Sequence, residues 1–267
     1  MKTFTKDSLK RELLEIAQLG FVPSPKDTST KRNDGAAGNL LERLLGIEEN
    51  NLPLPNAAEW ELKVQRAHTQ SNLTLFHMEP SPTALRFVPQ VLLPHYGWAH
   101  QEAGKKYSED EKSFRMTMNG RNFTDRGFKV LADGEKVKVV FDSSVVSDRH
   151  SEWLKAVDRN VGLGGLDPAP YWGYEDLRKK ISAKLQNTFY VTAEVKRVDG
   201  QEMFHFYRCE MLRGFALEGF LGLLEEGEAI VEFDARTGHN HGTKFRVKQI
   251  GLPKLYKEHD VVFDLSS

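Results

Sequence analysis

The residues WELKV, at positions 60–64, alternate apolar and charged side chains. This alternation predicts a half-buried β-strand, because successive side chains of a strand point to opposite faces of its sheet. Glu61 and Lys63 then project together on one face, and Leu62 points into the core. Such an acid–ammonium pair suits metal-assisted phosphodiester hydrolysis. The carboxylate holds a hard cation such as Mg²⁺, and the lysine orients the attacking water or offsets charge in the transition state.

A Glu-x-Lys triplet is a weak signal when it stands alone, because alternating charges on a solvated strand produce it often. This chain has a second copy, at residues 194–196, which leads into a turn at Asp199-Gly200 and is expected on a solvated hairpin. The first copy differs in its setting, since a predicted helix carrying Glu42 and a turn-rich approach carrying Asn56 precede it. The first copy is therefore the candidate for chemistry.

Hydrophobic periodicity and turn residues divide the chain into short helices and strands. Ser8 and Asn39 are the expected N-caps of two helices, and Asp-Gly pairs predict hairpin turns. The elements lack a regular strand–helix–strand rhythm, so we predict an α+β fold with a mixed sheet, not a doubly wound one. Helices are predicted over residues 8–19, 40–46, 152–157, 174–185 and 217–224, strands over 60–64, 73–76, 229–233 and 243–250, and hairpins over 126–142 and 189–209.

Composition sets limits on function and location. The 267 residues include 37 Lys plus Arg and 38 Asp plus Glu, so the chain has no global basic excess that would indicate nucleic-acid binding. A local basic groove is not excluded. No apolar run approaches the roughly 20 residues of a membrane span, and no secretion signal is visible. The single cysteine, Cys209, excludes an intrachain disulfide and a cysteine-based zinc cluster. We expect a cytoplasmic protein without membrane contact.

Blocks on both sides of the triplet carry more information than the triplet itself. They read GNLLERLLGI (38–47), LPNAAEWELKVQR (54–66), LTLFHMEP (73–80) and, more loosely, VEFDAR (231–236) and HNHGTKFR (239–246). In this order they resemble the MvaI/BcnI type II restriction endonucleases, relatives of the mismatch-repair nickase MutH within the PD-(D/E)xK nucleases.

The resemblance implies a restriction-endonuclease-like mixed sheet and two lobes around a DNA-binding cleft. Residues 1–90 would form the catalytic lobe and residues 91–267 the DNA-recognition lobe. The implied activity is Mg²⁺-dependent cleavage of double-stranded DNA at a short C/G-rich site by a monomer that cuts one strand at a time. A cognate DNA methyltransferase is the implied genetic partner.

The same resemblance assigns roles to four residues. Glu61 and Lys63 match the ExK pair, Glu42 matches the helix glutamate of the active site, and Asn56 falls where the family has a metal-binding aspartate. Mg²⁺ would be held by Glu61 and the Asn56 position. An amide is neutral and offers one carbonyl oxygen, so metal affinity and rate should both drop, in a naturally weakened enzyme or an inactivated variant. The alternative is that Asn56 is a turn former after Pro55.

A charged segment, residues 234–246, is the expected base-reading element. Asp234 and Arg236 are two apart, so they face the same way and suit a G·C pair, with arginine on guanine and aspartate on the cytosine amino group. By resemblance this segment enters the major groove, whereas the alternative is a solvated hairpin loop. His239 and His241 lack a third metal ligand in the sequence. The candidate DNA-binding residues are His77, Asp234, Arg236, His239, His241, Lys244 and Arg246.

Two further questions stay open at the level of sequence. Cations at residues 112–129 surround Phe114, Phe123 and Phe128, and these residues either line a DNA duplex or form a core hairpin with charged outer faces. The function also has two rivals. One is a catalytically silent, sequence-specific DNA-binding protein, motivated by Asn56. The other is a strand-specific nickase of the MutH kind, which would need an activating partner.

Overall fold

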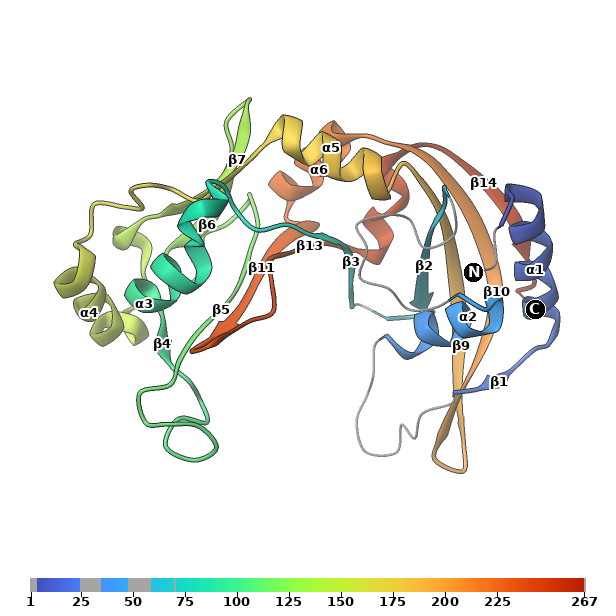
Figure 1. Ribbon diagram of the computed structural model, residues 1–267, viewed down its shortest axis with the longest axis horizontal. Coiled ribbons are helices and arrows are strands. Elements are labelled where there is room, and N and C mark those ends of the chain that lie inside the picture. The colour runs from blue at the N-terminus through green and yellow to red at the C-terminus, as the bar shows by residue number, and fades with distance from the viewer. Residues whose placement is uncertain (1–3, 25–34, 48–58, 70, 267) are drawn as a thin grey trace. The chain divides into compact units, whose positions relative to one another are not determined.

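The computed structural model describes residues 4–24, 35–47, 59–69 and 71–266 (Figure 1). Its contacts divide the chain into two compact units. Unit 1 comprises the described residues within 1–71, 178–216 and 252–267, and unit 2 comprises 72–177 and 217–251. Strands within residues 22–66 pair with strands within residues 187–215, so unit 1 combines segments that lie more than a hundred residues apart in the sequence.

Unit 1 is a mixed sheet with helices. Strand β2 runs parallel to β9, β9 forms an antiparallel hairpin with β10, and β10 also pairs with β1 and β14. The predicted strand at 60–64 and hairpin at 189–209 are thereby confirmed. The elements are α1 (Lys6–Gln18), β1 (Val22–Pro23), α2 (Ala36–Leu45), β2 (Glu61–Arg66), β9 (Asn187–Val198), β10 (Gln201–Phe215), a 3₁₀ turn (Pro253–Leu255) and β14 (Tyr256–Asp264).

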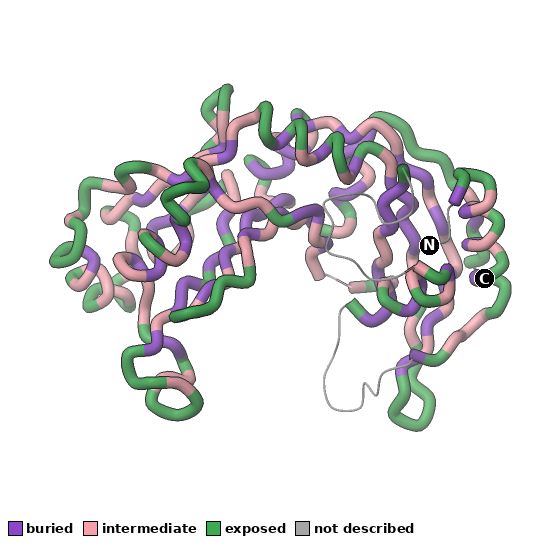
Figure 2. Tube along the Cα trace, in the orientation of Figure 1, coloured by how far each residue is buried: buried purple, intermediate pink, exposed green. Residues whose placement is uncertain are grey.

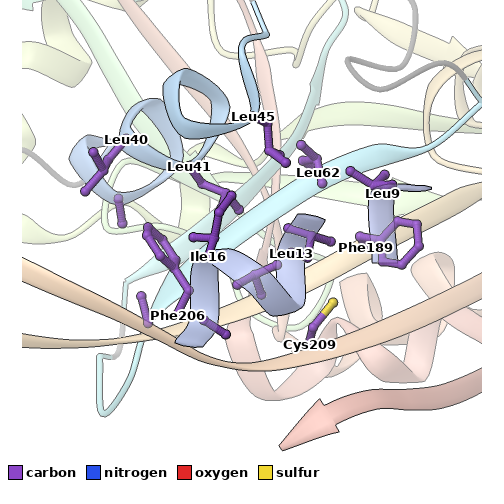
Figure 3. Packing of buried hydrophobic residues seen from close by; sticks show 14 of the residues in the cluster. Leu9, Leu13, Ile16, Leu40, Leu41, Leu45, Leu62, Phe189, Phe206 and Cys209 are labelled. Carbon is purple, nitrogen blue, oxygen red and sulfur yellow. The ribbon is translucent and has the colours of Figure 1, made fainter. Parts of the chain in front are cut away.

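Helices α1 and α2 pack their apolar faces on this sheet, as Figure 3 shows. Leu13 of α1, Leu41 of α2 and Leu62 of β2 meet Phe189 and Phe206 in one buried cluster. Each such side chain contributes roughly 1.5–3 kcal/mol by leaving water. This packing fixes which face of β2 is apolar, and so where its charged residues point.

Both of these helices begin earlier than the sequence predicted. The N-cap of α1 is Thr5, and Ser8 completes a capping box with it instead of capping the helix. Helix α2 starts at Ala36, so Asn39 lies inside the helix and is not its cap. The reason is that Ala36 and Ala37 favour a helix and are buried in the core, which extends α2 by one turn.

A buried ion pair joins β2 to β10. Arg66 donates hydrogen bonds of 2.8 and 2.9 Å to the two carboxylate oxygens of Glu202. These hydrogen bonds hold the pKa of Glu202 below its ordinary value, although burial opposes them. Both side chains are buried, so replacement of either one would break a buried ion pair and destabilise the fold.

Unit 2 contains two sheets. One has the order β3-β13-β11-β5-β4 with β12 paired to β11, and the other has the order β6-β7-β8. The elements are β3 (Asn72–His77), a 3₁₀ turn (Thr83–Leu85), a π-helical turn (Val88–Leu92), α3 (Leu93–Tyr96), β4 (Trp98–Ala99), β5 (Lys112–Met118), β6 (Phe128–Ala132), β7 (Lys136–Phe141), 3₁₀ turns (Ser143–Val145, Asp148–His150 and Gln249–Gly251), α4 (Ser151–Val161), β8 (Tyr171–Gly173), α6 (Leu217–Glu226), β11 (Ala229–Arg236), β12 (His239–Asn240) and β13 (Lys244–Lys248). Helix α5 (Tyr174–Lys184) belongs to both units, since the division falls within it.

The mixed α+β class is confirmed, and most predicted elements are present with shifted ends. The hairpin predicted over 126–142 is β6 and β7, and the predicted helices are α1, α2, α4, α5 and α6. Strands β5, β8 and β14 were not predicted. In the described part of the chain, no helix has the length and apolar character to cross a membrane.

Candidate functional site

The ExK strand has one apolar and one polar face. Leu62 and Val64 pack in the core, so Glu61, Lys63 and Gln65 point to the opposite face. The parallel register with β9 places Thr188 beside Glu61 and Tyr190 beside Lys63. The prediction that Glu61 and Lys63 share a face while Leu62 enters the core is confirmed.

Glu61 is a buried carboxylate with two ammonium neighbours. Its side chain is 3% exposed, and its Oε1 accepts a hydrogen bond of 2.7 Å from Lys63 Nζ. Lys184 Nζ, at the end of α5, lies 3.6 Å from the same oxygen. The other oxygen, Oε2, is buried and has no hydrogen-bond partner among the described residues.

The rest of this polar face is neutral and hydrogen-bonded. The hydroxyl groups of Tyr256 and Thr188 lie 2.7 Å apart, and the Tyr190 hydroxyl donates to Gln65 Oε1 at 2.8 Å. Burial raises the pKa of Tyr256, and the negative charge of Glu61 raises it further. Tyr256 therefore keeps its proton at neutral pH, and the charges of this face reside on Glu61 and the two lysines.

Lys184 was not predicted as a site residue. From the sequence, the spacing of Lys184 indicates only that it lies on the polar side of α5. Its position beside Glu61 results from the way the chain passes from α5 into β9. Glu42 lies half-buried on α2, a helix whose Leu41 and Leu45 pack in the same cluster as Leu62. Asn56 lies outside the described residues.

The structure allows one test of a divalent cation at this site. A hard cation takes oxygen ligands, and Glu61 Oε2 is a buried carboxylate oxygen to which no described residue donates a hydrogen bond. This oxygen fits one ligand position. The described residues contain no group of three or more His, Cys, Asp or Glu side chains that would complete a metal site by themselves.

The second ExK copy is solvated, as predicted. Glu194 and Lys196 are exposed near the tip of the β9–β10 hairpin, which is coloured as exposed in Figure 2. Lys196 Nζ lies 3.9 Å from the centre of the Phe21 ring. This copy has the same residue types as the first but lacks its burial, so it provides a matched control for experiments on Glu61 and Lys63.

In unit 2, the predicted base-reading residues share the polar face of the β3-β13-β11-β5 sheet. Glu232, Asp234 and Arg236 alternate along β11 with buried Phe233 and Ala235. The register places Lys244 opposite both Glu232 and His77, and Arg115 opposite Asp234. Arg246 follows two residues after Lys244 on β13. The structure thus brings residues from β3, β5, β11 and β13 onto one face.

Ion pairs connect the charges of this face. Asp234 accepts a hydrogen bond of 2.7 Å from Arg115 Nε, and Glu232 accepts 2.7 Å from Arg246 and 3.1 Å from Lys244. Burial alone would raise the pKa of both carboxyl groups, but these cations outweigh it and both pKa values lie below their ordinary range. Both acids are therefore charged at neutral pH and hold the cations in place.

The two loop histidines are exposed, and their ring centres are 4.2 Å apart. His239 lies on β12, while the backbone N–H of His241 donates to the Asp234 carbonyl at 3.0 Å. Among the described residues, no third His, Cys, Asp or Glu joins them in a metal-binding group. They are placed beside the charged face as surface groups.

The aromatic residues at 114–128 are mainly core residues. Phe114 and Phe128 are fully buried, and their ring centres are 5.7 Å apart. The Arg126 guanidinium lies between the rings of Trp98 and Trp153, at 4.2 and 4.9 Å, and burial lowers its pKa. The core-hairpin alternative therefore describes Phe114 and Phe128, whereas Phe123 is exposed.

Fold and site define a mixed α+β protein with a buried acid–lysine pair on one sheet and a charged face on another. The MvaI/BcnI restriction endonuclease family model matches residues 10–256. The chain belongs to this family.

Two solved structures have a similar fold. Restriction endonuclease MvaI in complex with its cognate DNA substrate matches with a TM-score of 0.74 and 19% identity, over 97% of this chain and 100% of that chain. MvaI in the absence of DNA matches with a TM-score of 0.54 and 20% identity, over 98% of this chain and 100% of that chain. At this identity the likeness concerns the fold.

A short stretch is also similar to a different kind of protein. Asparagine–tRNA ligases of Haemophilus influenzae strains PittEE and PittGG are 33% identical over 75 residues. The match covers 28% of this chain, which spans only 15% of the length of each ligase.

Proposed function

We propose that this protein is a type II restriction endonuclease that hydrolyses double-stranded DNA with Mg²⁺. The observation that supports this most is the buried Glu61, whose Oε1 faces Lys63 and Lys184 and whose Oε2 has no hydrogen-bond partner among the described residues. The family membership supports the same activity. In this proposal unit 1 performs the hydrolysis, unit 2 reads the bases, and the expected cleft of a PD-(D/E)xK nuclease receives the duplex.

Each residue of unit 1 has a defined role in this proposal. Glu61 would hold Mg²⁺ through Oε2, with the Asn56 position as second ligand and Glu42 as support. Bound Mg²⁺ would polarise the phosphate and lower the pKa of a water molecule. Lys63 orients the attacking water, and its charge offsets the negative charge that develops on the phosphate.

The charged face of unit 2 is the proposed DNA contact. The similar MvaI structure contains its cognate DNA substrate, and that supports double-stranded DNA as the partner here. Arg236 and Asp234 would read a G·C pair, and Lys244, Arg246, His77, His239 and His241 would contact bases or phosphates around it. A short C/G-rich site, a monomer, and a cognate methyltransferase complete the proposal.

A cleavage assay tests the function directly. Plasmids carrying diverse sequences are incubated with the protein and Mg²⁺ or Mn²⁺, and the ends of the products are sequenced. Discrete double-strand cuts at one short sequence support the proposal. Specific binding without cuts at any metal concentration would favour the silent DNA-binding protein, and nicks in one strand, or only with a partner protein, would favour the MutH-like enzyme.

Replacement of Arg236 by alanine should weaken binding to the specific site about tenfold more than binding to random DNA. A bidentate guanine contact is worth roughly 1–3 kcal/mol of discrimination. Fluorescence anisotropy with both duplexes, in the absence of divalent metal, measures the two dissociation constants. Equal losses on both duplexes would make Arg236 a phosphate contact and would contradict the base-reading role.

Replacement of Lys184 by methionine should lower the Mg²⁺ concentration for half-maximal cleavage about threefold, because one of two ammonium groups that compete for Glu61 is removed. Cleavage rates measured over a Mg²⁺ titration give this concentration. Lys179→Met is the matched control, since Lys179 is exposed on the same helix. An unchanged Mg²⁺ requirement in Lys184→Met would show that Lys184 does not act on the metal site.

A further inference from the structure

The loop between β4 and β5, residues 100–111, holds the side chain of Arg236. Glu111 at the end of this loop is 5% exposed, and its Oε1 accepts a hydrogen bond of 3.0 Å from Arg236 Nη1. The guanidinium carbon of Arg236 lies 4.5 Å from the centre of the Tyr107 ring. Arg236 Nη1 also donates to the Thr237 carbonyl at 3.3 Å. A buried acid and an aromatic face therefore fix one side of this guanidinium.

The loop is itself tied to the strands around it. His100 N–H donates to the Glu111 carbonyl at 2.8 Å, and the His100 ring packs edge-on against Tyr107, with centres 4.9 Å apart. Lys112 and Thr237 are joined twice, because each backbone N–H donates to the other residue, at 3.0 and 3.1 Å. Tyr107 and Glu111 are thus presented by a braced loop, although most of the loop is exposed (Figure 2).

The other edge of the same guanidinium is formed by Nε and Nη2. Nε and Nη2 of Arg236 have no protein partner among the described residues, whereas Nη1 has two. Arg236 also lines a cavity of about 770 Å³, together with Arg86, His239 and Asn240. Two parallel N–H groups to which no described residue is bound are the donors that match O6 and N7 of guanine.

From this geometry we propose that Tyr107 and Glu111 are positioning residues that hold Arg236 with its free edge toward a guanine of double-stranded DNA. The inference rests on the proposed function, because it assigns the residues that make the base contact specific. The acid accepts a hydrogen bond from Arg236 on the side away from the base, and the ring restricts its rotation. Less rotamer freedom is then lost when the base contact forms.

The test compares two acids of the same loop. Glu111→Ala removes the partner of Arg236, Glu111→Gln retains a hydrogen-bond acceptor, and Glu109→Ala makes the same charge change at an exposed position. The parental protein first selects its preferred duplex from a randomised library without divalent metal. Anisotropy then gives, for each variant, the ratio of dissociation constants for random and selected duplexes.

We expect Glu111→Ala to lower this discrimination ratio by about fivefold or more, and Glu111→Gln and Glu109→Ala to stay within about twofold of the parent. In an Arg236→Ala background, Glu111→Ala should cause no further loss of discrimination. Tyr107→Leu should likewise lower the discrimination ratio, and Tyr107→Phe should stay close to the parent. This second pair decides the question if Glu111→Ala does not fold.

Failure of the inference differs from failure of the proposed function. A parental protein that selects no sequence overturns the proposed function and the inference with it. If the parental protein discriminates and Glu111→Ala has the same discrimination ratio, only the positioning role is overturned. The same holds if the losses of discrimination caused by Glu111→Ala and Arg236→Ala add up in the double variant. Tighter binding of the selected duplex by Glu111→Ala than by Glu109→Ala would mean that Glu111 blocks Arg236, which is also incompatible with positioning.

Discussion

Replacement of Lys63 by alanine, or of Glu61 by alanine, is expected to reduce the cleavage rate to about one thousandth of the parental rate or less. A thousandfold loss corresponds to about 4 kcal/mol of barrier, which is typical when a charged group aimed at the reacting phosphate is removed. Both residues lie on the polar face of β2 and are joined by a hydrogen bond of 2.7 Å. Binding of the specific duplex should stay within a few-fold of the parental affinity.

The chain supplies the matched control for this experiment. Glu194→Ala and Lys196→Ala alter the second ExK triplet, which is exposed, and they should leave the rate unchanged. Cleavage is followed on a plasmid, in an Asn56→Asp background if the parental rate is low. A Lys63→Ala or Glu61→Ala protein that cuts at the parental rate would remove β2 from the active site.

Replacement of Asn56 by aspartate should raise the cleavage rate at least tenfold. The carboxylate of Glu61 is shared by two ammonium groups, so the charge at this site favours a phosphate more than a divalent cation. Mg²⁺ binds mainly through one or two carboxylates plus substrate phosphates. A second carboxylate adds the missing anionic ligand, and tenfold corresponds to about 1.4 kcal/mol of barrier.

A Mg²⁺ titration of cleavage in both proteins measures this effect, and Asn50→Asp offers an added carboxylate elsewhere in the same stretch of sequence as a control. In the absence of metal, the Asn56→Asp protein should bind DNA slightly more weakly, because it places another negative charge near a phosphate. If aspartate gives no gain at any metal concentration, Asn56 is a turn residue and the second ligand must come from another group.

The parts of the fold that local sequence patterns determine were predicted well. Alternation at 60–64 located β2, and Asp133-Gly134 and Asp199-Gly200 located the two hairpin turns. The ends of α1 and α2 were placed wrongly because Thr5 and buried alanines extend these helices beyond the residues with the strongest periodicity. Strand β14 is exposed along most of its length, so its alternation of apolar and polar residues is weak.

Local sequence patterns also determined only part of the candidate site. Glu61 and Lys63 were predictable because they lie two apart on one strand, where the period of the backbone alone sets their direction. Lys184 and Glu111 were not predictable, since their partners Glu61 and Arg236 lie on segments about 125 residues away in the sequence. No local pattern records such a contact, and neither residue type is unusual where it stands.

The chain passes between unit 1 and unit 2 four times, at residues 71/72, 177/178, 216/217 and 251/252. An exchange of unit 2 for that of a relative therefore requires two inserted segments and four junctions, not one fusion point. Cutting the chain once at residue 177 would leave β2 on one fragment and its partner β9 on the other. Each fragment would keep an incomplete core, so we expect activity only when both fragments are present and assemble.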